Sequence, residues 1–245
     1  MSRIACHTLS GVAIAGLIMP MVGKNGRQAI IQWWSTALLQ ILNVQVQVQV
    51  HGTPPPSYKT ARNNLLVANH ISWLDIHAIN SLLPVRFIAK DDIKAWPLFG
   101  YLAKKSNVLF IERGKRQHAP RIVDATRHCL QAGDNVCFFP EGTTTDGSTV
   151  LPFKSSVMES ALQAKSTIWP IAIRYPRMDG SINTEVAYAG ETTLLESIRC
   201  VIQQAQPVVE LHFLAPITAH PQAMQAKRRE LTQHIQANIT KQLKL

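Results

Sequence analysis

The chain has 245 residues, of which 46% are hydrophobic and 16% are charged. This length suffices for one sizeable α/β domain, and the composition excludes both a disordered chain and a multi-span membrane protein. Lysine and arginine outnumber aspartate and glutamate by 25 to 15, which gives a formal net charge of +10 and indicates an anionic partner. The low total charge favours a membrane surface over nucleic acid as that partner.

The cysteine pattern argues against a disulfide framework and against a structural zinc site. The chain has four cysteines, with no Cys-x2-Cys pair and no histidine at zinc-ligand spacing. We therefore expect no disulfide framework, no metal site and reduced thiols in the cytosol. The four are Cys6, Cys129, Cys137 and Cys200.

The first 43 residues carry three charged side chains, all of them basic. Residues 4–23 are uncharged and would be ~30 Å long as a helix, just enough to span a bilayer. A second uncharged stretch, 28–44, contains two tryptophans. We expect residues 1–43 to form a membrane-associated helical hairpin, with its turn at 23–27. The alternatives are a cleaved signal peptide, a single span, or two helices that pack on the globular core.

Residues 44–245 are expected to form the second unit, an α/β domain. Valine and glutamine alternate over 44–50, which predicts a strand with a buried valine face and a polar glutamine face. Beyond a stiff triple-proline linker at 54–56, apolar strands and amphipathic helices alternate. This pattern indicates a mixed, largely parallel sheet flanked by helices. The predicted strands are 65–68, 86–89, 108–111, 135–139, 167–174, 185–189 and 208–213, and the predicted helices are 74–83, 118–131, 156–164, 194–204 and 222–243.

A histidine and an aspartate follow the strand predicted at 65–68. Ser72 with Asp75 three residues later is typical of a capping box, so we expect a helix to begin at Ser72 and His70 to lie in the preceding loop. The Asp75 carboxylate could then reach back to His70 and fix its tautomer, as an acid does for a general base. The alternative is that Asp75 only caps the helix and His70 is a polar loop residue.

Two further polar segments follow predicted strands. Strand 108–111 leads to Arg113, which is well placed to bind a phosphate. Strand 135–139 leads to Glu141, which could bind a substrate hydroxyl or pair with Arg113; a tight turn without a ligand is the alternative. All three clusters follow strands, where open α/β sheets build their sites. The chain contains no GxSxG, P-loop, HExxH or GxGxxG motif.

These blocks, in this order, resemble the glycerolipid acyltransferase family typified by 1-acyl-sn-glycerol-3-phosphate acyltransferase. The resemblance covers roughly residues 48–170 and is compatible with the N-terminal hairpin. It implies a glycerol-3-phosphate acyltransferase-like fold and a catalytic role for His70 and Asp75, which match the family's His-x4-Asp motif. Substrate-binding positions are implied at the other blocks. They are Lys90, Arg113, Gly114, Glu141, Gly142, Thr143 and Pro170.

The chain departs from the family in the third block. Many members continue Glu-Gly-Thr with Arg-Ser, whereas this chain continues with Thr144, Thr145, Asp146 and Gly147. That variant is similar to a bacterial subgroup that includes acyltransferases of lyso-ornithine lipid. Either Lys154 substitutes for the missing arginine, or the acceptor carries a head group other than phosphate.

The resemblance implies transfer of a fatty acyl group from a thioester of acyl carrier protein or coenzyme A to the free hydroxyl of a lysolipid. The first candidate acceptor is 1-acyl-sn-glycerol-3-phosphate and the second is lyso-ornithine lipid. His70 would act as general base with Asp75 orienting it, without an acyl-enzyme and without a cofactor beyond the donor. Backbone N–H groups near Ser72 are candidate donors to the oxyanion.

The partners and location follow from this chemistry. A lysolipid acceptor is held in a bilayer, so we expect the enzyme on the cytoplasmic face of the cell membrane, monotopic or with a single span. Two other classes of protein fit the sequence less well. A nucleic-acid-binding module would interleave aromatics with its basic residues, and the basic segment after Arg113 does not. A non-catalytic membrane-bound scaffold is opposed by the intact His70, Asp75, Arg113 and Glu141.

Overall fold

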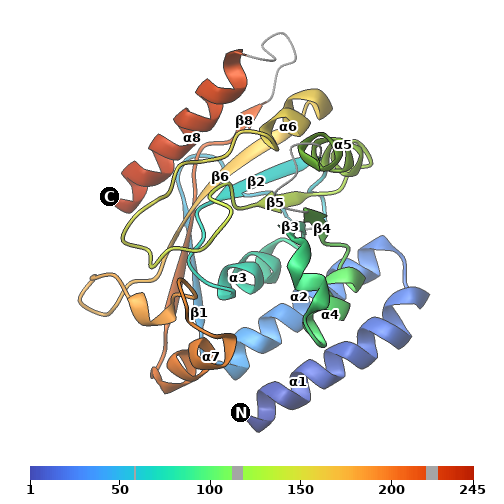
Figure 1. Cartoon of the computed structure of the whole chain (residues 1–245), viewed down its shortest axis with the longest axis vertical. Helices are drawn as coiled ribbons and strands as arrows, with labels where there is room; N and C mark the ends of the chain where they lie inside the picture. Colours follow the sequence, from blue (N-terminus) through green and yellow to red (C-terminus); the bar gives the residue numbers. More distant parts are fainter. Residues whose placement is uncertain (58, 112–117, 219–225) are drawn as a thin grey trace.

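An eight-stranded sheet forms the centre of the computed structural model, which describes residues 1–57, 59–111, 118–218 and 226–245 (Figure 1). The strand order is β1-β7-β6-β2-β5-β3-β4, and β8 pairs with β6. Neighbouring strands are parallel except at β6–β7 and β6–β8, as the predicted mixed sheet requires. The strands are β1 Gln45–Val50, β2 Asn64–Ala68, β3 Arg86–Lys90, β4 Leu109–Ile111, β5 Val136–Phe138, β6 Thr167–Arg174, β7 Val208–Phe213 and β8 Ile217–Thr218.

Helices cover both faces of the sheet (Figure 1). One core cluster joins the sheet to α2, α3 and α7, and a second joins its other face to α5, α6 and α8. All five residues of β2 are buried, as expected for a central strand covered on both sides. The helices are α1 Ser2–Ala13, α2 Lys24–Ile41, α3 Leu74–Leu82, α4 Phe99–Lys105, α5 His118–Gln131, α6 Met158–Ala164, α7 Leu194–Gln203 and α8 Ala226–Leu243.

The N-terminal segment is a helical hairpin. Helix α1 continues through a π turn and a 3-10 turn, so that Ser2–Met21 is 20 residues long and apolar enough to cross a membrane by length and composition. The chain reverses at Val22 and Gly23, and the predicted turn at 23–27 is wrong beyond that point because Lys24 already begins α2. The two helices differ in burial. α1 is largely exposed, whereas Leu38 and Leu39 of α2 lie in the core cluster that includes α3. The division of the chain at residue 43 stays a prediction.

Two sequence-based predictions are wrong in this sheet. The valine face of β1 is only partly buried, since Val48 is 38% and Val50 is 44% exposed. The reason is that β1 lies at one edge of the sheet, where β7 is its one strand neighbour among the described residues. Residues 185–189 do not form a strand: Thr184–Val186 is a 3-10 turn, and the amide of Tyr188 donates to the Ile71 carbonyl outside the sheet. Helix α4 and strand β8 were not predicted.

The parallel strands place the candidate residues. β2, β5, β3 and β4 all run in one direction, so their carboxyl ends share one edge of the sheet. The loop after β2 carries His70, and the loop after β5 carries Glu141. The topology thus brings together segments that lie about 70 residues apart in the chain.

Candidate active site

His70 and Asp75 are in direct contact. Nδ1 of His70 lies 2.8 Å from Oδ2 of Asp75, whose side chain is fully buried, while the His70 side chain keeps 17% exposure. An ionised carboxylate can only accept, so this contact places the proton of the neutral imidazole on Nδ1 and leaves the lone pair of Nε2 unprotonated. The pair therefore has one buried, oriented nitrogen and one nitrogen available to accept a proton.

The loop between the two residues differs slightly from the predicted capping box. Helix α3 begins at Leu74, two residues later than expected. The Asp75 carboxylate accepts from the amides of Ile71 at 2.8 Å and Ser72 at 3.0 Å, while the Ser72 hydroxyl accepts from the amide of Leu74 at 3.4 Å. Asp75 therefore closes the loop around His70 as well as holding its ring.

A tyrosine completes the surroundings of Asp75. The Tyr175 hydroxyl donates to Oδ1, the second carboxylate oxygen, at 2.6 Å. Tyr175 is 1% exposed, and burial together with the neighbouring Asp75 charge raises its pKa well above the usual value. The hydroxyl thus stays protonated and remains a donor. Sequence reasoning missed Tyr175 because it lies 100 residues beyond Asp75, just after β6, and only the pairing of β6 with β2 brings it close.

Glu141 joins the loop after β5 to the loop that carries His70. Its Oε1 accepts from the amide of His70 and its Oε2 from the amide of Leu151, both at 2.8 Å. The side chain is 4% exposed, and burial raises its pKa, although the two amides and the nearby His70 oppose that shift. Both oxygens are thus occupied by the protein's own main chain, and the substrate-binding role implied for Glu141 stays a prediction.

Two further contacts hold the histidine ring in place. The Phe139 ring stacks on the His70 ring with a centroid distance of 3.8 Å and an interplanar angle of 6°. The amide of Thr145 donates to the His70 carbonyl at 2.9 Å. Gly142 has a φ of 73°, and its amide donates to the Phe139 carbonyl, which makes the tight turn that glycine permits. The position of His70 is therefore fixed by contacts of its ring, its amide and its carbonyl.

The remaining predicted residues are spread around this edge. Thr143 and Lys154 are exposed, and Lys90 ends β3 in register with Ile111 of β4. Pro170 is buried within β6 opposite Val67, so it belongs to the sheet rather than to the loops around His70. Two predicted residues, Arg113 and Gly114, lie outside the described residues.

The variant third block faces inward. The Thr144 hydroxyl donates to the carbonyl of Tyr188, and the Thr145 hydroxyl donates to the carbonyl of Thr149 at 3.1 Å. Thr145 is 7% exposed. The two side chains that stand where many family members have Arg-Ser thus bind the protein's own main chain.

The amides predicted as oxyanion donors are already engaged. The amide of His70 donates to Glu141, and those of Ile71 and Ser72 donate to Asp75. The prediction that amides near Ser72 stabilise the oxyanion is therefore wrong for these three groups. Within residues 1–57, 59–111, 118–218 and 226–245, no group of three or more histidine, cysteine, aspartate or glutamate side chains is placed to hold a metal ion.

A histidine oriented by a buried carboxylate thus lies at the carboxyl edge of the parallel strands of an α/β fold, an arrangement that can take a proton from a substrate. Comparison with known proteins gives the particular family. The family model described as Acyltransferase matches residues 47–174, more than half of the chain. The chain therefore belongs to the acyltransferase family, which confirms the resemblance based on its motifs.

Individual relatives agree with this assignment. The lyso-ornithine lipid O-acyltransferase of Pseudomonas aeruginosa is 35% identical over 191 residues, which are 78% of this chain and 70% of the relative. The 1-acyl-sn-glycerol-3-phosphate acyltransferase of Neisseria gonorrhoeae is 37% identical over 167 residues, 68% of this chain and 63% of the relative. The crystal structure of the 1-acyl-sn-glycerophosphate acyltransferase PlsC from Thermotoga maritima superposes with a TM-score of 0.66 at 20% identity, over 100% of this chain and 97% of that one. This last likeness confirms the predicted fold.

Proposed function

We propose that this protein is a lysolipid O-acyltransferase in which His70 is the general base. The observation that carries the mechanism is the 2.8 Å contact between His70 Nδ1 and Asp75 Oδ2, because it leaves Nε2 free to accept a proton. Family membership supplies the class of reaction, acyl transfer. The two relatives described above are named for acylation of lysolipids, which supports a lysolipid as the acceptor.

The chemistry runs in two steps. As the acceptor hydroxyl attacks the carbonyl carbon of the acyl thioester, His70 Nε2 takes the hydroxyl proton and a C–O bond forms. The tetrahedral intermediate then collapses, the C–S bond breaks, and the sulfur leaves with the proton from Nε2. An ester and a free thiol result, and the histidine returns to its starting state. General base catalysis of this kind contributes about 10²–10⁴-fold.

Asp75 has two tasks in this scheme. Its contact with Nδ1 fixes the ring so that Nε2 faces the reacting hydroxyl, and its negative charge stabilises the imidazolium that forms as the proton arrives. Because the carboxylate is fully buried, water screens that charge weakly. The donor is an acyl thioester of acyl carrier protein or coenzyme A, and the reaction needs no further cofactor.

Two acceptor head groups are candidates. The first is 1-acyl-sn-glycerol-3-phosphate, the substrate in the name of the Neisseria relative. The second is lyso-ornithine lipid, and it is favoured by a specific observation. Thr144 and Thr145 stand where many family members have Arg-Ser. Both side chains are neutral, and their hydroxyls bind the protein's own main chain. These two positions thus supply no cation to pair with an acceptor phosphate, whereas an acceptor without a phosphate does not need one there.

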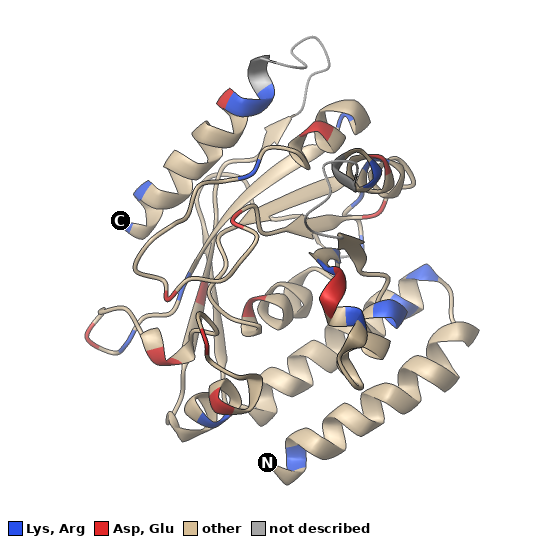
Figure 2. Cartoon of the chain, viewed as in Figure 1, with Lys and Arg blue, Asp and Glu red and all other residues tan. Residues whose placement is uncertain are grey.

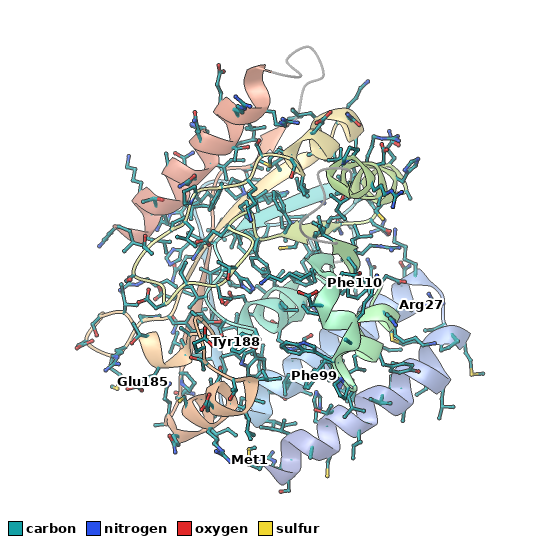
Figure 3. The ribbon with its side chains drawn as sticks, in the orientation of Figure 1. Met1, Arg27, Phe99, Phe110, Glu185 and Tyr188 are labelled. Carbon is teal, nitrogen blue, oxygen red and sulfur yellow. The ribbon has the colours of Figure 1, made fainter. Side chains whose placement is uncertain are left out.

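The membrane surface is proposed to meet α1 and α4. Leu17 is 71% and Met21 is 85% exposed, and on α4 Phe99 is 39% and Tyr101 is 38% exposed. The two elements touch at the π turn that continues α1, since a Cβ added at Gly16 of that turn would lie 2.9 Å from the Tyr101 hydroxyl. Figure 3 labels Phe99 on the part of α4 that lies nearest α1 in this view. Buried in lipid, such a surface would contribute about 1.5–3 kcal/mol per large side chain.

The charge pattern agrees with this orientation. Figure 2 shows α1 uncharged over most of its length, while basic residues gather at the start of α2 and on α4. Lys24 and Arg27 are the basic residues of the first turn of α2, and Lys104 and Lys105 end α4. Each basic residue near an anionic lipid surface adds about 1 kcal/mol to binding. We propose that this face lies on the cytoplasmic side of the cell membrane.

Vesicle flotation tests the membrane surface. With vesicles that contain phosphatidylglycerol, we expect Leu17→Asp to weaken binding at least tenfold, because a charge replaces an exposed apolar side chain of the π turn that continues α1. Met178→Asp is the matched control, since Met178 is fully exposed in a loop far along the chain. Equal binding by both variants would exclude α1 as the contact.

An acyl-transfer assay tests the reaction. The purified full chain in vesicles is given acyl carrier protein and coenzyme A thioesters with a panel of lysolipids that includes both candidate acceptors. We expect transfer to at least one lysolipid, and we expect His70→Ala to abolish it while His234→Ala, at an exposed position of α8, leaves it unchanged. Full activity of His70→Ala would overturn the mechanism. No transfer by the unmodified protein to any lysolipid would overturn the function.

A further inference from the structure

The Asp75 carboxylate has two oxygens with different surroundings. Oδ2 accepts from the His70 ring and from the amides of Ile71 and Ser72. Oδ1 accepts from the Tyr175 hydroxyl at 2.6 Å. The general base mechanism uses the contacts of Oδ2 and assigns no role to Oδ1. A buried carboxylate oxygen without a donor is strongly disfavoured, so the tyrosine satisfies a requirement that the loop around His70 leaves open.

Tyr175 is held rigidly against the His70 loop. The residue just before His70, Asn69, bonds with its side chain to both main-chain groups of Ile173, at 2.7 Å and 3.0 Å. The Tyr175 carbonyl accepts from the amide of Asn183 at 2.8 Å. Tyr175 thus comes directly after β6, whose end is hydrogen-bonded to the start of the loop that carries His70. The position of its hydroxyl is defined by main-chain contacts rather than by a mobile surface loop.

We propose that Tyr175 is a positioning residue that controls how strongly Asp75 holds the proton on His70. This inference rests on the proposed function and extends its dyad to a hydrogen-bonded chain, Tyr175 to Asp75 to His70. The hydroxyl fixes the plane of the carboxylate so that Oδ2 points at Nδ1. It also draws negative charge toward Oδ1, which weakens the attraction between Asp75 and the imidazolium.

The sharing of charge between the two carboxylate oxygens predicts the direction in which Tyr175 affects His70. With the hydroxyl present, part of the carboxylate charge lies on Oδ1, and Oδ2 attracts the imidazolium of His70 less strongly. Without it, the carboxylate charge concentrates on Oδ2 and the imidazolium is held more strongly. A tyrosine that served only to fill the core would affect stability and leave the protonation of His70 unchanged.

Tyr175→Phe is the first test, made in the full chain with acyl transfer as the readout. We expect kcat per folded molecule to fall about tenfold, because the plane of the Asp75 carboxylate is no longer fixed and the His70 ring is oriented less exactly. The KM values for donor and lysolipid should stay within about twofold, since Tyr175 is buried behind Asp75. The acid limb of the pH–rate profile should move to higher pH. Ile239→Val, a core change on α8 in the other cluster, is the control: it lowers thermal stability and should leave the profile in place.

A second variant keeps the test decisive if Tyr175→Phe fails to fold. Incorporation of 3-fluorotyrosine at position 175 keeps the ring and the hydroxyl but makes the hydroxyl a stronger donor. The acid limb should then move to lower pH, the opposite direction from Tyr175→Phe. An unchanged pH profile in the fluorotyrosine protein, or a profile in Tyr175→Phe that matches the wild type, would overturn the proposal.

The failure of this inference is distinguishable from failure of the proposed function. The His70 ring can be titrated by nitrogen-15 NMR in detergent micelles, with its resonance assigned from its absence in His70→Ala. This readout does not require turnover. We expect its midpoint to shift up in Tyr175→Phe and down with fluorotyrosine, even if the unmodified protein acylates none of the lysolipids offered. Equal midpoints in all three proteins would refute the role of Tyr175 alone.

Discussion

Replacement of Asp75 by asparagine tests the proposed catalytic charge while preserving the contacts around it. The asparagine oxygen can take the place of Oδ2 and accept from His70, Ile71 and Ser72, and its NH2 group can donate to the Tyr175 hydroxyl oxygen, so the three contacts that hold the His70 loop are kept and only the Tyr175 O–H loses its acceptor. What is lost is the negative charge. For unit charges about 4 Å apart at an effective dielectric constant near 20, that interaction is about 4 kcal/mol. We therefore expect kcat to fall roughly 10³-fold.

The assay is initial-rate acyl transfer in vesicles, with the fold checked by urea unfolding. Asp179→Asn is the matched control, because Asp179 lies in an exposed turn where it bonds Ser181. It should keep wild-type activity. If Asp75→Asn retained more than a tenth of the wild-type kcat while His70→Ala was inactive, the charge of Asp75 would not serve catalysis and the reasoning would be refuted.

Two further predictions concern stability and pH. Glu141→Gln should lower the free energy of unfolding by about 1–3 kcal/mol, because glutamine cannot accept from both the His70 and Leu151 amides. Burial also raises the pKa of Glu141, so the wild type should hold an additional margin over the variant at low pH and lose that margin, but not the amide contacts, as pH rises from the ordinary value of 4.5 through the raised one. Urea titrations from pH 4 to 7 check the sign, and a difference that grows with pH would contradict it. Burial, with His7 nearby, lowers the pKa of His77 from 6.5 to about 4. As pH falls from 6.5 to 4, the free energy of unfolding of the wild type should therefore decrease by up to about 3 kcal/mol, and that of His77→Phe should not show this decrease. His128→Phe, at an exposed position, should lose as much stability as the wild type, and an equal loss in His77→Phe would exclude protonation of His77 as the cause.

Short-range patterns in the sequence determined the fold class and the core of the site. The alternation of strands and helices predicted a largely parallel sheet, since each apolar strand must be buried between amphipathic helices. His70 and Asp75 were found because they lie five residues apart, a distance over which a loop and the first turn of a helix bring two side chains together. Such features depend on neighbouring residues and on periodicity, which are legible in a single chain.

Tertiary structure decided which distant residues support that pair. Tyr175 meets Asp75 because β6 lies beside β2 in the sheet, and Glu141 meets the His70 amide because β5 lies on the other side of β2. The same strand order leaves β1 at an edge, with its valine face partly exposed. Strand order is set by the packing of whole helices on both sheet faces, an energy summed over many weak contacts. No local pattern encodes that sum, so the partners of His70 and Asp75 come together only when the sheet is assembled.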